Sequence, residues 1–524
     1  MTSQTVEFKP HFGAFVLETL TLGMYGESRN AIREYVQNGF DSLRHSIRVG
    51  LISETEAKIE VVLDVEKQTL VITDNGAGLR TESAVDVLAS VGASNKNYRR
   101  NAGFRGIGRL AGIVFCDKLT FIAKAQGEPK KTMVVFDAKE LRAKLSPHGD
   151  YSRDAAATLR SCVKASLEDA SDRIEDHFFE VRLEGFFNPP LECQNLEHLR
   201  SFLSQVSPLP YRPDFGFRDE ILAWADENGK ELESIRLFVG DSEEDLEELF
   251  KPYGKDFGVK TQRVNLSGVD FVASPTGRWW GWVGRKRTPG SIKDDDAKGI
   301  RIRVRNIQID GTDIMRDIFA VSRLSSKPRL SYARLVDWYP GEIFVSSEAA
   351  VPNARRDGFE EDGDWAIIRN ELDVMVAEIY GKAAYRTSTA DQLSVPNITK
   401  RLNRLAEVAE PMIAARMADW DKVSQALAEA TEIQSRLKRA VKSAEDTELT
   451  DLRAISEKVS RLKFQMDTLA VEAPGQGGCE AEVATAVSDL TQRLYREFRA
   501  RLPPTEWQRV RGILEDVTGE APLD

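Results

Sequence analysis

The sequence predicts an α+β protein that ends in an all-helical region. Residues 1–210 mix helical and strand patterns, and residues 211–390 show a second such mixture. From about Asn397 onward, apolar residues recur at helical spacing alone. The chain has 524 residues, and about 100–200 residues per domain is usual. We therefore expect three domains, at residues 1–210, 211–390 and 391–524.

The composition is that of a globular protein with an acidic surface. Hydrophobic residues make up 41% of the chain, charged residues make up 30%, and the net charge is -11. Such acidity repels nucleic acid and anionic membranes unless basic residues gather locally. No stretch approaches the roughly 18 apolar residues of a membrane span, and no signal peptide pattern opens the chain. We therefore expect no membrane partner.

The four cysteines lie far apart and form no CxxC pair. This spacing favours neither a structural zinc site nor a disulfide framework. Free cysteines fit a reducing compartment, so we expect a cytoplasmic protein. The cysteines are Cys116, Cys162, Cys193 and Cys479.

The first domain is predicted from one long helix and four strands. The helix covers about Ser28 to Val49. Four segments alternate or run apolar as strands do, and the first two form a hairpin. These strands are Lys58–Val65, Thr69–Asp74, Leu119–Ala125 and His177–Gly185. The proline-rich segment Pro208–Pro213 is typical of a domain boundary.

The second domain contains three strand candidates, at Glu233–Gly240, Arg278–Gly284 and Ile300–Ile309. An acidic loop, Asp294–Asp296, separates the last two. The middle strand carries three tryptophans and is followed by Arg285–Arg287. Basic and aromatic residues together can bind a nucleic acid. A strand that buries its tryptophans beside a solvated basic turn is the alternative.

The third domain contains two runs of apolar residues at heptad spacing. The first extends from Val423 to Ala444 and the second from Leu452 to Leu469. This spacing is typical of helices that pack side by side as in a coiled coil. The phase of the pattern changes between the runs, so a helical hairpin and one long coil both fit. The seam could join two copies of the chain or close a bundle within one chain.

Three polar residues lie on one face of the first long helix. Glu34, Asn38 and Asp41 fall within about 60° of one another at 100° per residue. Ile32 and Val36 lie on the opposite face, toward a core. Taken alone, the polar face fits a solvated stripe on an amphipathic helix.

An acidic residue ends the second predicted strand and opens a turn that reads Asp74-Asn75-Gly76-Ala77-Gly78. A carboxylate at this place can accept a hydrogen bond from an exocyclic amine. Glycines let a flat ring approach the backbone closely. An Asx-type turn, which Asp-Asn-Gly forms readily, is the alternative.

A second glycine-rich segment extends from Gly103 to Gly112, ahead of an apolar stretch. Its backbone N–H groups can bind an anion at the start of a helix. The segment is not a GxGxxG directly after a strand, and no GxxxxGK[ST] occurs in the chain. The sequence therefore favours neither a Rossmann site nor a Walker site.

The order of these three motifs resembles the GHKL superfamily of gyrase-type enzymes, ninety-kilodalton heat-shock chaperones, histidine kinases and mismatch-repair ATPases. The resemblance covers roughly residues 12–190 and implies a Bergerat-type α/β sandwich that hydrolyses Mg-ATP. It implies Glu34 as the general base and Asn38 as the magnesium ligand. It also implies Asp74 as the acceptor of the adenine amine, with Gly78 making room for the base. The further ATP-binding residues that it implies are Asp41, Gly76, Ser94 and Lys96 in a mobile lid, Gly103, Phe104, Arg105, Gly106, Ile107 and Gly108.

One position departs from the family pattern. The family has a Gly-Thr before its late strand, with the threonine near the adenine, and this chain has Asp176-His177 there. His177 could form the hydrogen bond instead. The counterpart of the threonine could also lie elsewhere.

The segment Glu342–Phe359 resembles the middle-domain loop of the heat-shock branch, which implies an S5-like middle domain. In that loop an asparagine and an arginine reach into the ATP site, and here these would be Asn353 and Arg356. A guanidinium from a second domain can stabilise charge on the γ-phosphate and catalyse the reaction. The alternative is a surface basic pair, Arg355 and Arg356, beside Asp357.

The sequence thus predicts a homodimeric, ATP-dependent clamp that needs ATP and Mg2+ and holds or remodels a protein client. The acidic charge and the Arg356 loop favour this chaperone-like function. A DNA-handling clamp is the second hypothesis. The third is a platform that assembles with a co-encoded effector, as in bacterial defence-type operons, which the sequence neither supports nor excludes.

Overall fold

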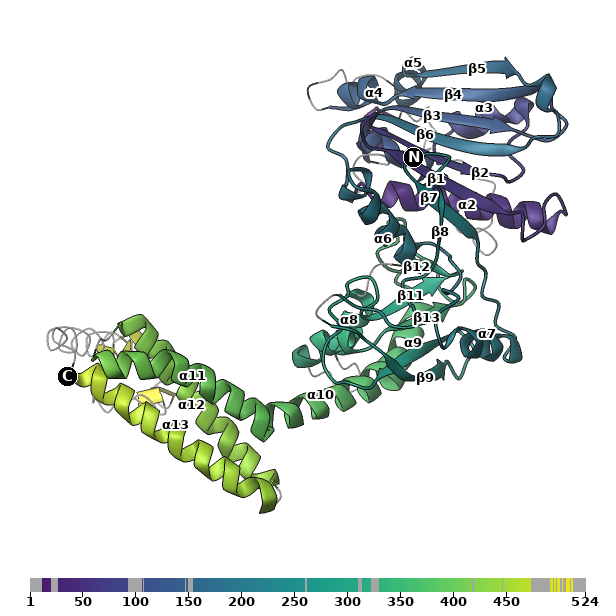
Figure 1. Cartoon of the computed structure of the whole chain (residues 1–524). Helices are drawn as coiled ribbons and strands as arrows, with labels where there is room; N and C mark the ends of the chain where they lie inside the picture. The colour runs from purple at the N-terminus through teal and green to yellow at the C-terminus, as the bar shows by residue number, and fades with distance from the viewer. Residues whose placement is uncertain are drawn as a thin grey trace, which may run out of the picture. The chain divides into compact units, whose positions relative to one another are not determined.

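The structure is a computed structural model with a mixed α+β architecture, as predicted (Figure 1). The chain divides into two compact units, residues 1–387 and 388–524. The described residues are 12–19, 27–92, 106, 108–146, 148, 154–259, 262–309, 313–321, 329–416, 419–444, 446–472 and short stretches between 491 and 511.

The first unit begins with an eight-stranded sheet in the order β5-β4-β3-β6-β2-β1-β7-β8. Neighbouring strands are antiparallel except β1 and β7, which are parallel. Every second residue of β1 and β2 is buried, as expected where a sheet packs one face on a core. The strands are β1 Lys58–Asp64, β2 Thr69–Asp74, β3 Cys116–Lys124, β4 Lys130–Asp137, β5 Val163–Asp169, β6 Phe178–Phe186, β7 Arg236–Gly240 and β8 Glu247–Leu249.

Helix α2, Asn30–Arg48, lies against this sheet and carries the polar residues of the first motif (Figure 1). Its side chains Ile32 and Val36 share a core with Ile59 of β1, as the helical spacing predicted. The other helical segments of this part are α1 Phe15–Glu18, α3 Thr81–Ala89, η2 Gly108–Val114, α4 Ala138–Leu145, α5 Ala155–Ser161, η3 Ser171–Arg173, η4 Leu191–Cys193 and α6 Leu196–Val206.

The polar face of α2 is buried as well. Of its three residues, Asp41 is 4% exposed, the Glu34 side chain is 12% exposed and Asn38 is half-buried. Burying charged groups is costly unless they find partners, so this face meets other polar groups of the protein. The interpretation of the face as a solvated stripe is therefore wrong.

A five-stranded sheet follows, in the order β12-β11-β13-β10-β9. Its central strands β11 and β13 are buried along their whole length, because apolar clusters cover both faces. The strands are β9 Leu266–Ala273, β10 Trp279–Lys286, β11 Ile300–Val304, β12 Ile307–Ile309 and β13 Gly341–Val345. The helices are α7 Arg218–Glu227, α8 Asp313–Ala320, η5 Leu330–Trp338, α9 Gly363–Leu372, the π-turn η6 Asp373–Ala377 and α10 Glu378–Leu393.

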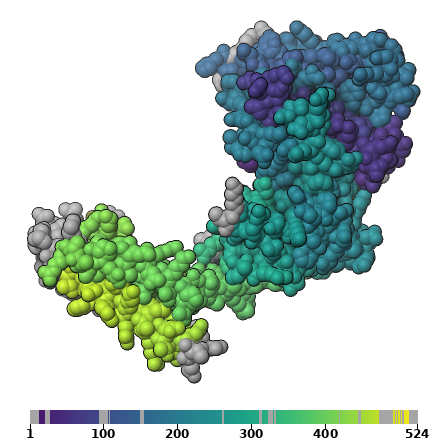
Figure 2. Space-filling model, in the orientation of Figure 1, coloured from purple at the N-terminus to yellow at the C-terminus, as the bar shows by residue number. Residues whose placement is uncertain are grey.

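One strand belongs to a different sheet from the one predicted. The segment Glu233–Gly240 was expected in the second domain, but its strand β7 pairs with β1 of the first sheet. Leu237 and Val239 extend the core of that sheet. In the space-filling view the teal atoms of this part of the chain reach into the purple and blue N-terminal part (Figure 2). A boundary at residue 210 therefore does not separate the two sheets.

The tryptophans of β10 are core residues. Trp279, Trp280 and Trp282 are between 0% and 5% exposed, and Arg285, which follows them, pairs with Asp270 at 3.1 Å. The buried-strand alternative is therefore correct, and the tryptophans are not available to stack on nucleic-acid bases.

A carboxylate on the five-stranded sheet is buried together with two cationic side chains. Glu342 accepts hydrogen bonds from Lys251 at 2.7 Å, from Tyr211 at 2.5 Å and from Arg303, and all three charged side chains are fully buried. Burial alone would raise the pKa of the Glu342 carboxyl. Arg303 and Lys251 overcome that effect and lower the pKa to about 2, so the group stays ionised.

Within its described residues, the second unit contains the helices α11 Val395–Ala415, α12 Trp420–Ser443 and α13 Asp446–Glu472. The predicted heptad residues of α12 and α13, such as Ile433 and Val459, pack with α11 in one buried cluster. The seam therefore closes a bundle within the chain. No helix in the described part of the chain is long and apolar enough to cross a bilayer.

Candidate functional site

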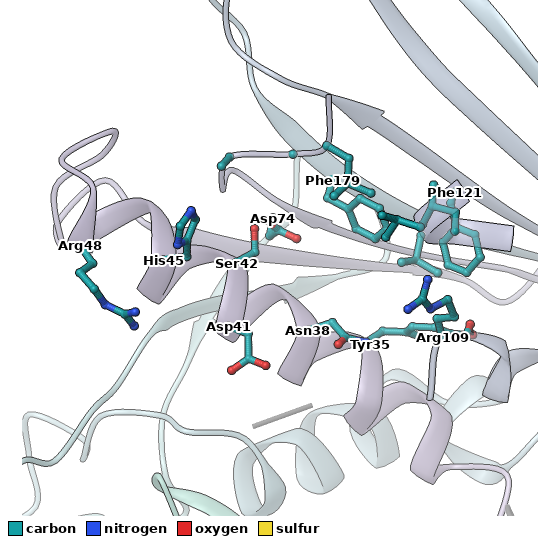
Figure 3. A pocket seen from close by; sticks show the side chains of 16 residues that line it. Tyr35, Asn38, Asp41, Ser42, His45, Arg48, Asp74, Arg109, Phe121 and Phe179 are labelled. Atoms are coloured by element: carbon teal, nitrogen blue, oxygen red, sulfur yellow. Dashed lines mark hydrogen bonds between the residues drawn. The ribbon is translucent and has the colours of Figure 1, made fainter. Parts of the chain in front are cut away.

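A cavity of about 390 Å³ lies between α2 and the sheet of the first unit. Asn38 and Ser42 of α2 line one side, and Asp74 at the end of β2 lies across from them (Figure 3). Phe121 of β3 and Phe179 of β6 form an apolar wall. The described residues that line the cavity are Tyr35, Asn38, Asp41, Ser42, His45, Arg48, Asp74, Ala77, Gly78, Leu79, Val87, Leu88, Arg109, Phe121, Phe179 and Val181.

The turn after β2 is held in place by hydrogen bonds on both sides. The carboxylate of Asp74 accepts a hydrogen bond from the Gly76 N–H at 3.0 Å, which is the Asx-type turn of the sequence analysis. Ser46 of α2 accepts one from the Ala77 N–H at 2.8 Å. A Cβ on Gly76 would lie 2.1 Å from the Ser42 hydroxyl oxygen, so only glycine fits there. The turn therefore positions Asp74 at the cavity and does not compete with a binding role.

Gly78 occupies a position that requires glycine. Its φ is +62°, and a Cβ would lie 2.0 Å from the backbone oxygen of Lys124. The buried Lys124 side chain in turn donates to the carbonyls of Glu128, Ile174 and Asp176, at 3.0 to 3.3 Å. The turn after β2 can approach the backbones of β3 and β6 this closely only with glycine at position 78.

Replacing Gly78 by alanine is expected to lower nucleotide affinity by at least about tenfold. A left-handed backbone costs an L-residue about 1–2 kcal/mol, and the added Cβ must displace the Lys124 backbone. Calorimetric titration with Mg-ATP measures the change. Gly127→Ala is the matched control, since Gly127 has a φ of +78° with nothing within 4 Å of its Cβ position. Equal affinities of the two variants would contradict this role for Gly78.

His177 holds the same turn from the opposite side. Its Nδ1 lies 2.9 Å from the carbonyl oxygen of Gly76. His177 does not line the cavity among the residues described, and neither does Gly76. The structure thus places His177 behind the turn, where it supports the position of Asp74.

Glu34 lies beside the glycine-rich segment and pairs with an arginine in the loop that follows β13 of the five-stranded sheet. Its Oε1 is 3.2 Å from the Nε of Arg356, and both side chains are largely buried. A Cβ on Gly108 would lie 2.3 Å from the Glu34 Oε2, so the backbone of that segment reaches the carboxylate. Arg356 also has a left-handed φ of 57°. The interpretation of Arg356 as part of a surface pair beside Asp357 is therefore wrong.

Asn353 forms hydrogen bonds with residues of its own loop, which follows β13. Its side-chain Nδ2 donates to the Asp357 carboxylate at 2.7 Å, and its backbone carbonyl oxygen accepts from the Arg356 N–H at 3.2 Å. It does not line the cavity among the residues described. These bonds shape the turn that carries Arg356, and contact of Asn353 with ATP stays a prediction.

Asp41 lines the cavity, but its carboxylate meets an arginine that the sequence analysis missed. Arg305 lies 3.2 Å from Asp41 and 2.9 Å from Glu233, with its guanidinium over the ring of Phe40. Arg305 and Asn306 form the tight turn between β11 and β12, both with left-handed φ. An asparagine in a two-residue link between apolar strands is a recognised hairpin signal, but it predicts only the turn and not the contact of Arg305 with Asp41.

Arg109 is a second cavity residue that the sequence analysis missed. It follows Gly108 directly, and its backbone oxygen accepts a hydrogen bond from the Tyr35 hydroxyl at 3.0 Å. Burial lowers the pKa of its guanidinium, which still remains a cation at neutral pH. Its position inside a glycine motif was the available signal.

Of the ATP-binding residues predicted in the glycine-rich segment, Gly106 and Gly108 are described. Gly106 has a φ of 72° and its carbonyl accepts from the Gly92 N–H at 3.3 Å. The other predicted residues of this region lie outside the described residues and stay predictions. They are Ser94, Lys96, Gly103, Phe104, Arg105 and Ile107.

Comparison with known families identifies this part of the chain. Residues 26–155 match the model of the histidine kinase-, DNA gyrase B- and HSP90-like ATPases. The chain therefore carries a domain of the GHKL superfamily, the family that its three motifs indicated.

Within that superfamily the chain is similar to bacterial HSP90-like proteins. The chaperone protein HtpG of Polaromonas naphthalenivorans is 29% identical over 207 residues, which are 36% of this chain and 31% of the relative. HtpG of Rhodococcus jostii is 24% identical over 194 residues, 32% of this chain and 29% of the relative. The matches thus span less than a third of the length of these relatives.

Proposed function

We propose that this chain binds Mg-ATP in the cavity beside α2 and hydrolyses it with Glu34 as the general base. The observation that carries the proposal is convergence: Asn38, Asp74 and Gly78 come from separate motifs and line one cavity. Glu34 lies four residues before Asn38 in α2, against Gly108. In this proposal the first sheet with its helices is a Bergerat-type sandwich, and the five-stranded sheet belongs to an S5-like middle domain.

The residues present fit an adenine nucleotide. Asp74 is an acceptor close to Phe179 of the apolar wall, which suits a base with an exocyclic amine, and Gly78 lines the cavity beside it. The Asn38 side chain would hold Mg2+, which neutralises charge on the phosphates. Glu34 would take the proton of the attacking water, and Arg356 would stabilise the charge that develops on the phosphate.

The Glu34–Arg356 ion pair suggests how the middle domain controls the reaction. Arginine binds phosphate at least as well as it binds a single carboxylate. A γ-phosphate beside Glu34 therefore competes for the Arg356 guanidinium and releases the Glu34 carboxylate. Binding of the nucleotide and activation of the base are thereby coupled.

Replacing Arg356 by alanine is expected to reduce turnover about 100-fold or more, because one preorganised donor to the developing charge is lost. Nucleotide affinity should remain nearly unchanged. Phosphate release and calorimetry measure the two quantities. Arg355→Ala is the matched control, since the Arg355 side chain is exposed. A loss of affinity in Arg356→Ala, with turnover at saturation unchanged, would contradict the assignment.

The most direct test of the activity is phosphate release by the full chain. We expect slow release that requires Mg2+ and ATP and that disappears in Asp74→Asn, which keeps the shape of Asp74 and removes an acceptor. Absence of phosphate release by the folded wild-type chain would refute the hydrolytic function.

We propose a chaperone-like output in which a homodimer closes on a protein partner, either a client or a co-encoded effector. Similarity to the HtpG proteins supports this choice. No observation favours the DNA clamp, since the tryptophans of β10 are buried. Pull-down with Glu34→Gln and ATP, set against the same variant without nucleotide, tests the proposal. A partner set that is the same with and without ATP would contradict it.

A further inference from the structure

Arg109 is a cation inside the cavity whose guanidinium has no counter-charge among the described residues. Its Nη1 is fully enclosed and has no hydrogen-bond partner, and no carboxylate of the described residues forms an ion pair with it. The two carboxylates that line the same cavity have other contacts: Asp41 meets Arg305, and Asp74 accepts from the Gly76 N–H. A buried charge without a counter-charge is costly, so the site favours an anion.

The backbone of Arg109 is fixed where it stands. The hydroxyl of Tyr35 donates to the Arg109 carbonyl at 3.0 Å and accepts from the Gly112 N–H at 2.8 Å. Tyr35 is itself buried in the core of the first unit. The guanidinium therefore projects into the cavity from a rigid base, on the side that carries Phe121 (Figure 3).

Arg109 lies at the Glu34 end of the cavity. Gly108, the residue before it, has its Cα against the Glu34 carboxylate, and Tyr35 follows Glu34 in α2. His45 and Arg48 line the opposite end, as Figure 3 shows. If water is activated at Glu34, the phosphates lie at this end as well, within reach of the long Arg109 side chain.

We propose that Arg109 binds the phosphate chain of the nucleotide and makes the cavity prefer ATP to adenosine. This inference rests on the proposed function. The guanidinium offers several donors in a planar array that matches phosphate oxygens. Hydrogen bonds to a charged group contribute more than neutral ones, which corresponds to an expected 10- to 100-fold effect on affinity. The Arg109 side chain thereby contributes binding that the backbone N–H groups of the glycine-rich segment do not supply.

Calorimetric titration of the full chain with ATP, ADP and adenosine, all with Mg2+, tests this role. Arg109→Met should weaken ATP binding about 10- to 100-fold and adenosine binding little, whereas Arg109→Lys should restore part of the ATP affinity. Arg160→Met, which removes an exposed cation of α5 that is not among the residues lining the cavity, should leave all three affinities unchanged. Inorganic tripolyphosphate should compete with ATP in the wild type and fail to compete in Arg109→Met.

The outcomes separate this inference from the proposed function. A wild-type chain that binds none of the three ligands contradicts the proposed function. A wild type that binds ATP, with Arg109→Met binding it equally well, overturns the role of Arg109 alone. Equal losses for ATP and adenosine in both Arg109 variants also overturn it, because they indicate a structural effect.

Discussion

Replacing Glu34 by glutamine is expected to lower ATP turnover by about 10²–10⁴-fold while Mg-ATP still binds. Glutamine keeps the size of the side chain beside Gly108 but cannot accept the proton of the attacking water. It also weakens the hold on Arg356, which pairs with the Glu34 carboxylate at 3.2 Å. Affinity for ATP should therefore be unchanged or higher. Phosphate release under saturating ATP, combined with calorimetry, measures both effects.

The control for Glu34 is a carboxylate away from the cavity. Glu82, in the first turn of α3, is exposed, and Glu82→Gln should hydrolyse ATP at the wild-type rate. If Glu34→Gln turned over ATP as fast as this control, the assignment of the general base would be wrong.

Replacing Glu342 by glutamine is expected to lower the free energy of unfolding by about 3–5 kcal/mol. The change leaves Lys251 and Arg303 fully buried without their counter-charge. It also leaves one acceptor oxygen where the carboxylate has two, so the Tyr211 hydroxyl competes with both cations for it. Urea unfolding monitored by tryptophan fluorescence suits this part of the chain, because Trp282 donates to Tyr211 at 2.8 Å.

The Glu342 effect should depend on pH with a defined sign. Its pKa is about 2 in the folded chain, against 4.5 for the ordinary group. The stabilisation is therefore complete above pH 4.5 and is lost as the pH falls toward 2, because only the unfolded chain takes up the proton. The difference in the free energy of unfolding between the wild type and Glu342→Gln should narrow by about 1.4 kcal/mol per pH unit below 4.5. Glu348→Gln, an exposed control after β13, should show neither effect, and a gap that widens in acid would contradict the account.

The local parts of the fold were predictable from the sequence. The helix around Glu34 and the hairpin β1–β2 follow from spacing within short segments, and the structure has them at nearly the predicted bounds. The position of β7 was not predictable in this way, because a strand pattern does not say which distant strand it pairs with. The heptad seam likewise showed that helices pack together without showing that all of them belong to one chain.

In the candidate site, too, the sequence predicted what depends on local motifs and did not predict contacts between distant segments. Asn38, Asp74 and Gly78 belong to local motifs and were found, and the structure brings them to one cavity. The contacts of Asp41 with Arg305 and of Glu34 with Arg356 join helix α2 to turns that lie more than 250 residues away in the sequence, so only the tertiary structure shows them. Resemblance to a known loop pointed to Arg356, whereas nothing comparable pointed to Arg305.

The central claim is that the cavity between α2 and Asp74 holds Mg-ATP. Isothermal titration calorimetry of the folded full chain tests it most directly. The account predicts saturable binding at one site per chain, retained in Glu34→Gln and lost in Asp74→Asn. No heat of binding in the wild type, or binding that Asp74→Asn leaves intact, would contradict it.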